Sequence, residues 1–339
     1  MNETERRARF PVVADWAYLN HAAIGPLTAA AARRLADLAH LVAASGDRHW
    51  PARNEDVEEA RRRAARLLGA ASPASIAFVE NTGTALSLVA EGLPWRPGDS
   101  VVGAEGEYPA NVYPWMHLAR RGVELRRVPP RPDGRIDPAD LLAACDRTTR
   151  VLALSWVQWT TGFRSDLALL AAACRERDLL FVVDVIQGLG ALALDVEAAG
   201  VDVAAGSAHK WLLGPEGIAV LYLGPRAAER LAPARAGWRS VARPFEWERE
   251  DLDFAAGALA LECGTLNVYG IVALGESIAE LLDEGPAEVE RRVLAAADRL
   301  AELLPAAGYR VAGPRRPGER SGIVSAVPPP GPDGAPTSA

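Results

Sequence analysis

The sequence predicts an α/β layered fold built on a mainly parallel sheet. Short apolar runs rich in Val, Ile, Leu and Phe recur through the first two thirds of the chain, at 75–80, 99–104, 150–157, 179–185, 201–206 and 217–223. Most of these runs lack polar alternation, which is typical of strands covered on both faces. Segments with helical signals separate the runs, and an alternation of strand and helix favours a parallel sheet with helices on its faces.

Two segments carry clear helix-start signals. Asp137 followed by Pro138 predicts an N-cap with a proline in the first turn. Pro26 predicts the start of a helix rich in Ala, Leu and Arg that ends near Gly46, because glycine commonly follows the last helical residue. Both helices fit the layered arrangement.

The pattern changes after about residue 260. Two long helical stretches at 267–283 and 286–307 precede strand-like pieces at 309–313 and 321–327. This order indicates a second, smaller lobe of mixed helix and strand.

We therefore expect three parts in the chain. Residues 1–260 form a large domain with its N-terminal segment, residues 261–325 form a smaller and incomplete C-terminal domain, and residues 326–339 form a disordered tail. The last residues, PPPGPDGAPTSA, bury too little apolar area to offset the entropy lost on ordering.

Charge and composition favour a small-molecule partner. The net charge is −7, and acids lie beside the Arg61–Arg63 cluster, so no basic surface for nucleic acid or anionic lipid is expected. The start of the chain lacks the apolar core of a secretory signal, and no apolar run approaches the length of a membrane span, which favours the cytoplasm. The three cysteines form no CxxC, so we expect reduced thiols and no metal.

Polar clusters follow three of the expected strands. They are Thr82–Thr84, Asp184 with Gln187, and Ser207 with His209 and Lys210. Alone, such an aspartate is usually a helix cap and such a lysine a solvated charge. In open α/β sheets, however, ligands bind at the carboxyl ends of the strands, so the three clusters are expected to meet at one edge of the sheet.

Together these groups are what a pyridoxal 5′-phosphate (PLP) site needs. A lysine amine forms a Schiff base with the cofactor, and Lys210 is the candidate. A carboxylate must keep the pyridine nitrogen protonated, and Asp184 is suitably placed. The phosphate needs helix-start amides, hydroxyls and a glycine, which NTGTALSLVAEG offers right after a strand.

The stretches FVENTGTALSLVA, VVDVIQGLGAL, DVAAGSAHKWLLGPEGIAVLY and ECGTLN resemble the class V aminotransferase family of fold type I PLP enzymes. That family includes cysteine desulfurases, kynureninases and isopenicillin N epimerase. The similarity runs from about residue 20 to about residue 325. It implies a large domain with a mainly parallel seven-stranded sheet and a smaller α+β C-terminal domain, apparently shortened here.

The resemblance also implies a role for individual residues. Lys210 becomes the Schiff-base lysine, Asp184 the partner of the pyridinium nitrogen, and Gln187 a donor to the phenolic oxygen of the cofactor. The positions that match phosphate contacts are Thr82, Gly83, Ser207 and His209, with Thr265 reaching the phosphate of a neighbouring subunit. That last role implies a homodimer with shared active sites. Tyr108 stands where many members have a histidine that stacks on the ring, and an aromatic face of either kind stacks.

Residues for the amino-acid substrate are harder to assign. Candidates are Asn20, His21, Trp159 and Arg239. Family members usually grip the substrate carboxylate with an arginine of the last lobe, but Arg315, Arg316 and Arg320 come too early to match it. Arg239 is the substitute, because its loop lies near the cofactor in relatives, and Arg164 is second.

Other functions remain open. Gly188, Gly190 and Ala193 fit a dinucleotide fingerprint, but the acidic residue that such a site needs is not at the end of the next strand. Cysteine desulfurases carry a nucleophilic cysteine in their C-terminal region, and no cysteine follows Cys263, which disfavours persulfide chemistry. We expect an enzyme most like isopenicillin N epimerase-like proteins, acting on the Cα or side chain of an amino acid. The alternatives are a truncated PLP-binding pseudoenzyme and a desulfurase or lyase-type member.

Overall fold

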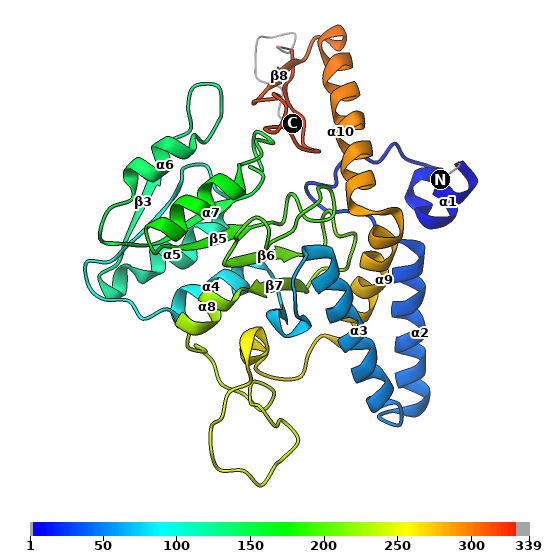
Figure 1. Cartoon of the computed structure of the whole chain (residues 1–339). Coiled ribbons are helices and arrows are strands. Elements are labelled where there is room, and N and C mark those ends of the chain that lie inside the picture. The colour runs from blue at the N-terminus through cyan, green and yellow to red at the C-terminus, as the bar shows by residue number, and fades with distance from the viewer. Residues whose placement is uncertain (1–2, 330–339) are drawn as a thin grey trace.

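A seven-stranded sheet forms the centre of the computed structural model, which describes residues 3–329 (Figure 1). Its strands are β1 (Ile76–Val79), β2 (Ser100–Ala104), β3 (Glu124–Val128), β4 (Thr149–Ser155), β5 (Leu180–Asp184), β6 (Val203–Ser207) and β7 (Ala219–Leu223). The order across the sheet is β1-β7-β6-β5-β4-β2-β3. Only β7 runs against its neighbours, so the prediction of a mainly parallel sheet with seven strands is confirmed.

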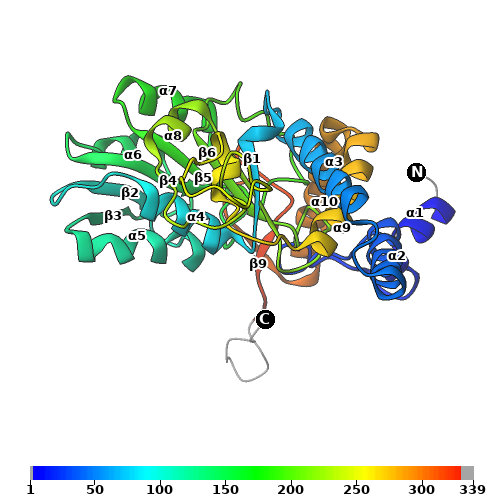
Figure 2. The ribbon, with the colours of Figure 1, turned by 90° about the horizontal axis from the view of Figure 1, so that it is seen from below.

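Helices surround this sheet. They are α1 (Glu3–Arg9), α2 (Ala29–Ser45), α3 (Trp50–Leu68), α4 (Thr82–Gly92), α5 (Tyr113–His117), α6 (Pro138–Ala144), α7 (Leu167–Glu176), α8 (Pro225–Arg230), α9 (Val268–Glu284) and α10 (Pro286–Leu303). Figure 2 shows the sheet lying between α7 on one side and α4 and α5 on the other. The long helix α9 packs against both α2 and α3.

The strands bury side chains on both faces of the sheet. In β4, Leu152 and Leu154 belong to one apolar cluster, while Val151 and Ala153 belong to a second cluster. Helices α3, α6, α7 and α9 contribute to the first cluster, and α4, α5 and α8 contribute to the second. This double burial explains why the strands read as continuous apolar runs.

The sequence misses one strand and misplaces one helix start. Strand β3, with the sequence ELRRV, pairs only with β2 at the edge of the sheet, where charged side chains keep contact with water. Helix α2 begins at Ala29 and not at Pro26, because the Thr28 side chain caps it by accepting a hydrogen bond from the Ala31 amide. The predicted cap at Asp137 is confirmed, since its side chain accepts from the Ala139 amide.

The C-terminal part has the predicted order of elements. Helices α9 and α10 are followed by the antiparallel pair β8 (Arg310–Ala312) and β9 (Ser325–Val327). Strand β9 takes in the first two residues of the expected tail, and residues 330–339 of that tail lie outside the described part of the chain. Within residues 3–329, no helix is both long and apolar enough to span a bilayer.

Candidate active site

Three parallel strands bring the expected site residues to one edge of the sheet. Strands β1, β5 and β6 run in the same direction, because β7 is antiparallel to both β1 and β6 while β5 and β6 are parallel. Their carboxyl ends lead to Thr82, Asp184 and Lys210, respectively. The predicted meeting of the three polar clusters is therefore what this topology produces.

Lys210 is buried beside an aromatic ring. The residue is 9% exposed, and its Nζ lies 5.4 Å from the centroid of the Tyr108 ring. Burial lowers the pKa of the Lys210 amine, and the negative charge of Asp184 opposes this effect. A larger fraction of the amine is thus neutral near pH 7 than for a surface lysine, and only a neutral amine is a nucleophile.

The N-terminal loop holds the backbone around Lys210. The Gly25 amide donates a hydrogen bond of 2.7 Å to the His209 carbonyl oxygen. On the other side, Leu213 has a φ of +57°, in the left-handed region that favours glycine, and its carbonyl accepts from Ser277 Oγ at 2.8 Å. The segment from His209 to Leu213 is therefore fixed from two directions.

Asp184 lacks a cationic side-chain partner at hydrogen-bond distance among the described residues. It is 2% exposed, and its Oδ1 accepts one hydrogen bond, from the Ile186 amide at 2.9 Å. Burial raises the pKa of Asp184 to about 7, and the charge of Glu107 adds to this rise while Lys210 opposes it. The site thus offers a carboxylate that a cationic ligand would stabilise.

Gln187 is oriented by two hydrogen bonds. Its Oε1 accepts from the Trp211 indole N–H at 3.0 Å, and its Nε2 donates to the Ala22 carbonyl at 3.0 Å. Since an indole N–H only donates, the amide orientation is fixed, and the second hydrogen on Nε2 remains for another acceptor. The His21 ring stacks on Trp211 with centroids 5.3 Å apart, so His21 supports this corner of the site from the outside.

Thr82 and Ser207 form a polar cradle at the start of α4. Ser207 Oγ accepts from the Thr82 amide at 2.9 Å and lies 2.9 Å from Thr82 Oγ1, which accepts from the Ser207 amide. Asn81 caps the helix by accepting from the Thr84 amide at 2.8 Å. The first turn of a helix attracts anions, so this end of α4 suits a phosphate.

Tyr108 and Trp159 form an aromatic wall. Their rings meet edge to face with centroids 5.6 Å apart, and the Trp159 indole donates to the Gly106 carbonyl at 2.9 Å. Both residues are nearly half exposed, so a ligand against them finds apolar surface that is open to solvent. Trp159, an expected substrate residue, is thereby placed next to the ring that faces Lys210.

The other expected residues are more exposed to solvent than Lys210 and Asp184. Asn20 is exposed, and its backbone carbonyl accepts from the amides of Ala23 and Ile24 to form the turn before Gly25. His209 is half buried, and burial together with the Lys210 charge lowers its pKa. Thr265 is exposed on a loop that lines a hollow of about 120 Å³ with Glu80.

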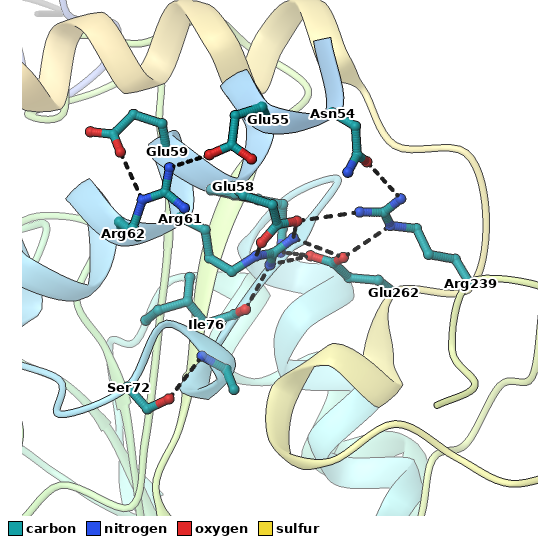
Figure 3. A network of polar contacts seen from close by, with 12 residues as sticks. Asn54, Glu55, Glu58, Glu59, Arg61, Arg62, Ser72, Ile76, Arg239 and Glu262 are labelled. Carbon is teal, nitrogen blue, oxygen red and sulfur yellow. Dashed lines mark hydrogen bonds and ion pairs between the residues drawn. The ribbon is translucent and has the colours of Figure 1, made fainter. Parts of the chain in front are cut away.

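Arg239, the expected substitute for the carboxylate clamp, takes part in a polar network. Its side chain is 14% exposed and contacts Glu262 at 3.4 Å, Asn54 at 3.4 Å and Glu58 at 3.6 Å (Figure 3). Glu262 is in turn paired with the buried Arg61 at 2.7 Å. Among the described residues, the polar contacts of Arg239 all belong to this network and none joins it to Lys210 or Asp184, so its guanidinium is already engaged.

The second arginine is also paired. Arg164 contacts Glu290 at 2.6 Å and lies over the ring of Trp156. Arg315 and Arg320 both pair with Asp298. These arginines tie the C-terminal elements together.

Sequence reasoning missed a buried polar group beside the site. Glu107 is bonded to Ser155 and Gln158, which come at and after the end of β4. The one signal available was the position of Glu107 next to Tyr108.

The glycines of the dinucleotide-like motif allow close packing. A Cβ on Gly188 would lie 2.3 Å from the Trp156 ring, and a Cβ on Gly190 would lie 2.3 Å from the Trp211 carbonyl oxygen.

Comparisons with known proteins agree on one family. The family model described as Aminotransferase class-V matches residues 18–329. The chain is 33% identical to the isopenicillin N epimerase of Streptomyces clavuligerus, over 98% of this chain and 85% of that protein. It is 36% identical to a probable cysteine desulfurase of Methanothermobacter thermautotrophicus, over 66% of this chain but only 54% of that protein.

Solved structures share the same fold. The apo cysteine desulfurase of Thermococcus onnurineus superposes with a TM-score of 0.85 at 23% identity, covering 96% of this chain and 82% of that one. The cystine C-S lyase C-DES, in complex with cysteine persulfide, gives 0.85 at 24% identity, covering 91% of this chain and 84% of that one.

Proposed function

Since this chain belongs to the class-V aminotransferase family, and is thus a PLP-dependent enzyme, we propose that Lys210 holds the cofactor and that the substrate is an amino acid. The observation that carries the proposal is the burial of the Lys210 amine against the Tyr108 ring and within the field of Asp184. A surface lysine has neither neighbour.

Asp184 supports the fit of PLP on electrostatic grounds. A carboxylate that is 2% exposed and accepts one backbone hydrogen bond pays a desolvation penalty, which its raised pKa records. A protonated ring nitrogen would supply the missing cation and a second hydrogen bond. We assign Asp184 to that contact and Gln187, with its remaining amide hydrogen, to the phenolic oxygen.

The start of α4 supports the fit at the other end of the cofactor. Thr82 and Ser207 offer hydroxyls next to helix-start amides, and Gly83 follows in the first turn. A Cβ on Gly83 would lie 3.2 Å from the Asn81 side chain that caps the helix, so glycine leaves this cap undisturbed. We assign Thr82, Gly83, Ser207 and His209 to the phosphate.

The residues of this chain then have separable tasks in the reaction. PLP, when bound, supplies an electron sink that makes bonds at the substrate Cα labile. Lys210, with its lowered pKa, is suited to accept and return the Cα proton. Asp184 would hold the proton on the ring nitrogen, and the aromatic wall of Tyr108 and Trp159 would cover one face of the bound ring.

Two reactions are candidates for this site. The first is chemistry at Cα of the kind named for isopenicillin N epimerase, since that relative aligns with nearly the whole chain. The second is removal of sulfur from cysteine, named for the Methanothermobacter relative, of which the chain spans little more than half. For either reaction we propose a substrate with an α-amino acid group, and Asn20, His21 and Trp159 remain our candidates for contacts to it.

Incubation of the holoenzyme with single amino acids distinguishes the two reactions. Uptake of deuterium at Cα without loss of the side chain supports the first. Formation of alanine from cysteine, with sulfide released once an added thiol reduces the transferred sulfur, supports the second. If no amino acid changes the absorption of the bound cofactor, the proposed substrate class is wrong.

We also propose a homodimer in which Thr265 reaches the phosphate of the neighbouring subunit. Its position on an exposed loop beside Glu80, just beyond the end of β1, supports this role. All three cysteines are free in the structure, which suits a reducing compartment such as the cytoplasm.

A further inference from the structure

Glu107 is a buried carboxylate with neutral partners only. The residue is 8% exposed and directly precedes Tyr108. Its Oε1 accepts from the Ser155 amide at 2.8 Å and from Gln158 Nε2 at 2.7 Å, and its Oε2 accepts from Asn111 Nδ2 at 3.3 Å and contacts Ser155 Oγ. Within residues 3–329, no arginine, lysine or histidine forms a hydrogen bond or salt bridge with it.

These partners are arranged to bind a charged carboxylate. A backbone amide only donates, and Asn111 must turn its NH2 toward Glu107 because its Oδ1 accepts from the Trp115 indole N–H at 3.1 Å. Gln158 likewise presents its NH2. With the Ser155 hydroxyl as a fourth donor, both oxygens of Glu107 are saturated without a proton of their own. Burial nevertheless raises the pKa of Glu107 above the ordinary range of a glutamate, because four neutral donors replace water only in part.

The sheet places this carboxylate close to Asp184. Ser155 and Asp184 are register partners in the parallel pair of β4 and β5. Adjacent strands lie about 4.8 Å apart, and register partners of parallel strands point to the same face. Because Glu107 contacts the side chain of Ser155, it lies on the face that carries Asp184, one strand farther along.

We propose that Glu107 is a positioning residue that sets a second negative charge behind Asp184, so that the two carboxylates together keep the bound cofactor protonated. This inference rests on the proposed function. One carboxylate beside the protonated ring nitrogen leaves the pair with no net charge. A second carboxylate nearby leaves one negative charge in excess, and this charge further stabilises the proton on the ring.

Few other charges act on this group. Asp184 is the charged residue that faces Glu107 from β5, and Lys210 acts on Asp184 from the loop after β6. His209 feels the charges of Lys210 and Glu216. The donors from β4, from the segment after it and from the turn at 109–111 are neutral. A change of charge at Glu107 is therefore not compensated by a neighbouring ion.

The test measures the pH at which the absorption of the bound cofactor changes, together with the ¹⁵N chemical shift of ring-labelled PLP. In Glu107→Gln, loss of the negative charge should lower the absorption midpoint by on the order of one pH unit, because protonated forms lose an attractive charge. The ¹⁵N chemical shift should show that the ring nitrogen also loses its proton at a lower pH than in the wild type. Glu107→Asp, which keeps the charge, should stay closer to the wild type than Glu107→Gln does.

Asp99→Asn is a matched control. Asp99 is also a buried acid, 5% exposed, but it precedes β2 at the amino end of the sheet and pairs with Arg150 at 2.9 Å. This variant removes one buried negative charge far from the site and should leave the midpoint where it is. Equal shifts in Asp99→Asn and Glu107→Gln would overturn the proposal, since the effect would then follow net charge or stability and not position.

A second variant covers the case in which Glu107→Gln does not fold. Ser155→Ala removes one donor, raises the pKa of Glu107 and should move the midpoint downward by a smaller amount; no shift or an upward shift refutes the proposal. If the wild type holds PLP on Lys210 but Glu107→Gln keeps the wild-type midpoint, this inference fails alone. If the wild type takes up no PLP, the proposed function fails.

Discussion

Gly25 lies so close to the backbone of Lys210 that a Cβ at position 25 would stand 2.0 Å from the Lys210 carbonyl oxygen. Neither atom belongs to a flexible side chain, so Gly25→Ala must push the N-terminal loop away from the loop after β6. We expect a loss of about 1 to 3 kcal/mol in the free energy of unfolding and weaker retention of PLP. Urea denaturation and dialysis of the holoenzyme measure the two effects.

Gly264→Ala is the control for this substitution, because a Cβ there would meet its nearest neighbour, the Trp238 indole, at an ordinary 3.9 Å. Equal losses in the two variants would mean that the close approach of Gly25 to Lys210 contributes nothing specific to stability or to PLP retention.

Lys210 should be the residue that holds the cofactor covalently. Reduction of the holoenzyme with borohydride is expected to fix PLP on the peptide that contains Lys210, because this amine is buried with a lowered pKa beside the Tyr108 ring. Mass spectrometry of the digested protein identifies the labelled peptide. Lys210 is the only lysine of the chain, so label on the N-terminal peptide, or no label, contradicts the assignment.

Asp184 should make the cofactor-free protein less stable at higher pH. Its pKa is raised from 3.8 to about 7 on folding, so between these values the folded state holds a proton that the unfolded state has released. The free energy of unfolding therefore falls as the pH rises from about 4 to 7, by on the order of 2 to 4 kcal/mol.

Urea unfolding at pH 5 and pH 8 measures this difference. Asp184→Asn should remove most of it, and bound PLP should reduce it in the wild type by supplying a cation. The same pH dependence in Asp184→Asn and wild type would show that another group is responsible.

Arg239 and Arg61 should differ sharply in their effect on stability. Arg61 is 1% exposed and donates to Glu262 and to the Ile76 carbonyl. Arg61→Met therefore leaves the buried Glu262 carboxylate with only the longer contact to Arg239 as a cationic partner, and should cost about 3 to 5 kcal/mol. Arg239→Lys lies at the edge of the network and should cost about 1 kcal/mol or less.

Titration with amino acids then tests the hypothesis that Arg239 grips a substrate carboxylate. We expect half-maximal spectral change at the same concentration in Arg239→Lys as in the wild type, because the guanidinium is engaged by Glu262 and Asn54. A tenfold weakening with PLP binding intact would restore the carboxylate role.

The sequence predicts those strands whose residues are buried on both faces of the sheet, because such strands are continuous apolar runs. The strands at the centre of the sheet were found because both of their faces are covered, while β3 was missed because its edge position tolerates charged residues. The strand-end residues Asp184 and Lys210 can be proposed as site residues from the sequence because the chemistry of PLP needs both types of group.

The network around Glu107 had no such signal. Three buried polar residues donate hydrogen bonds to this one carboxylate: Ser155, Gln158 and Asn111. Contacts between separate segments of the chain leave no periodic pattern in the sequence, so these contacts could not be predicted. The pairing of Arg239 was missed for the same reason, since its partner Asn54 lies 185 positions away in the chain.

The hydrogen bond between Gln187 and Ala22 joins residues 165 positions apart, and the bonds between Thr82 and Ser207 span 125. Loops of this length close slowly, because the chain loses entropy before the contact is made. The cofactor pocket therefore depends on the meeting of distant segments, as the pairing of β1 with β7 does. A folding chain should acquire its helices, which depend on local contacts, before it gains affinity for PLP, so that cofactor capture accompanies the closing of the sheet and does not nucleate folding.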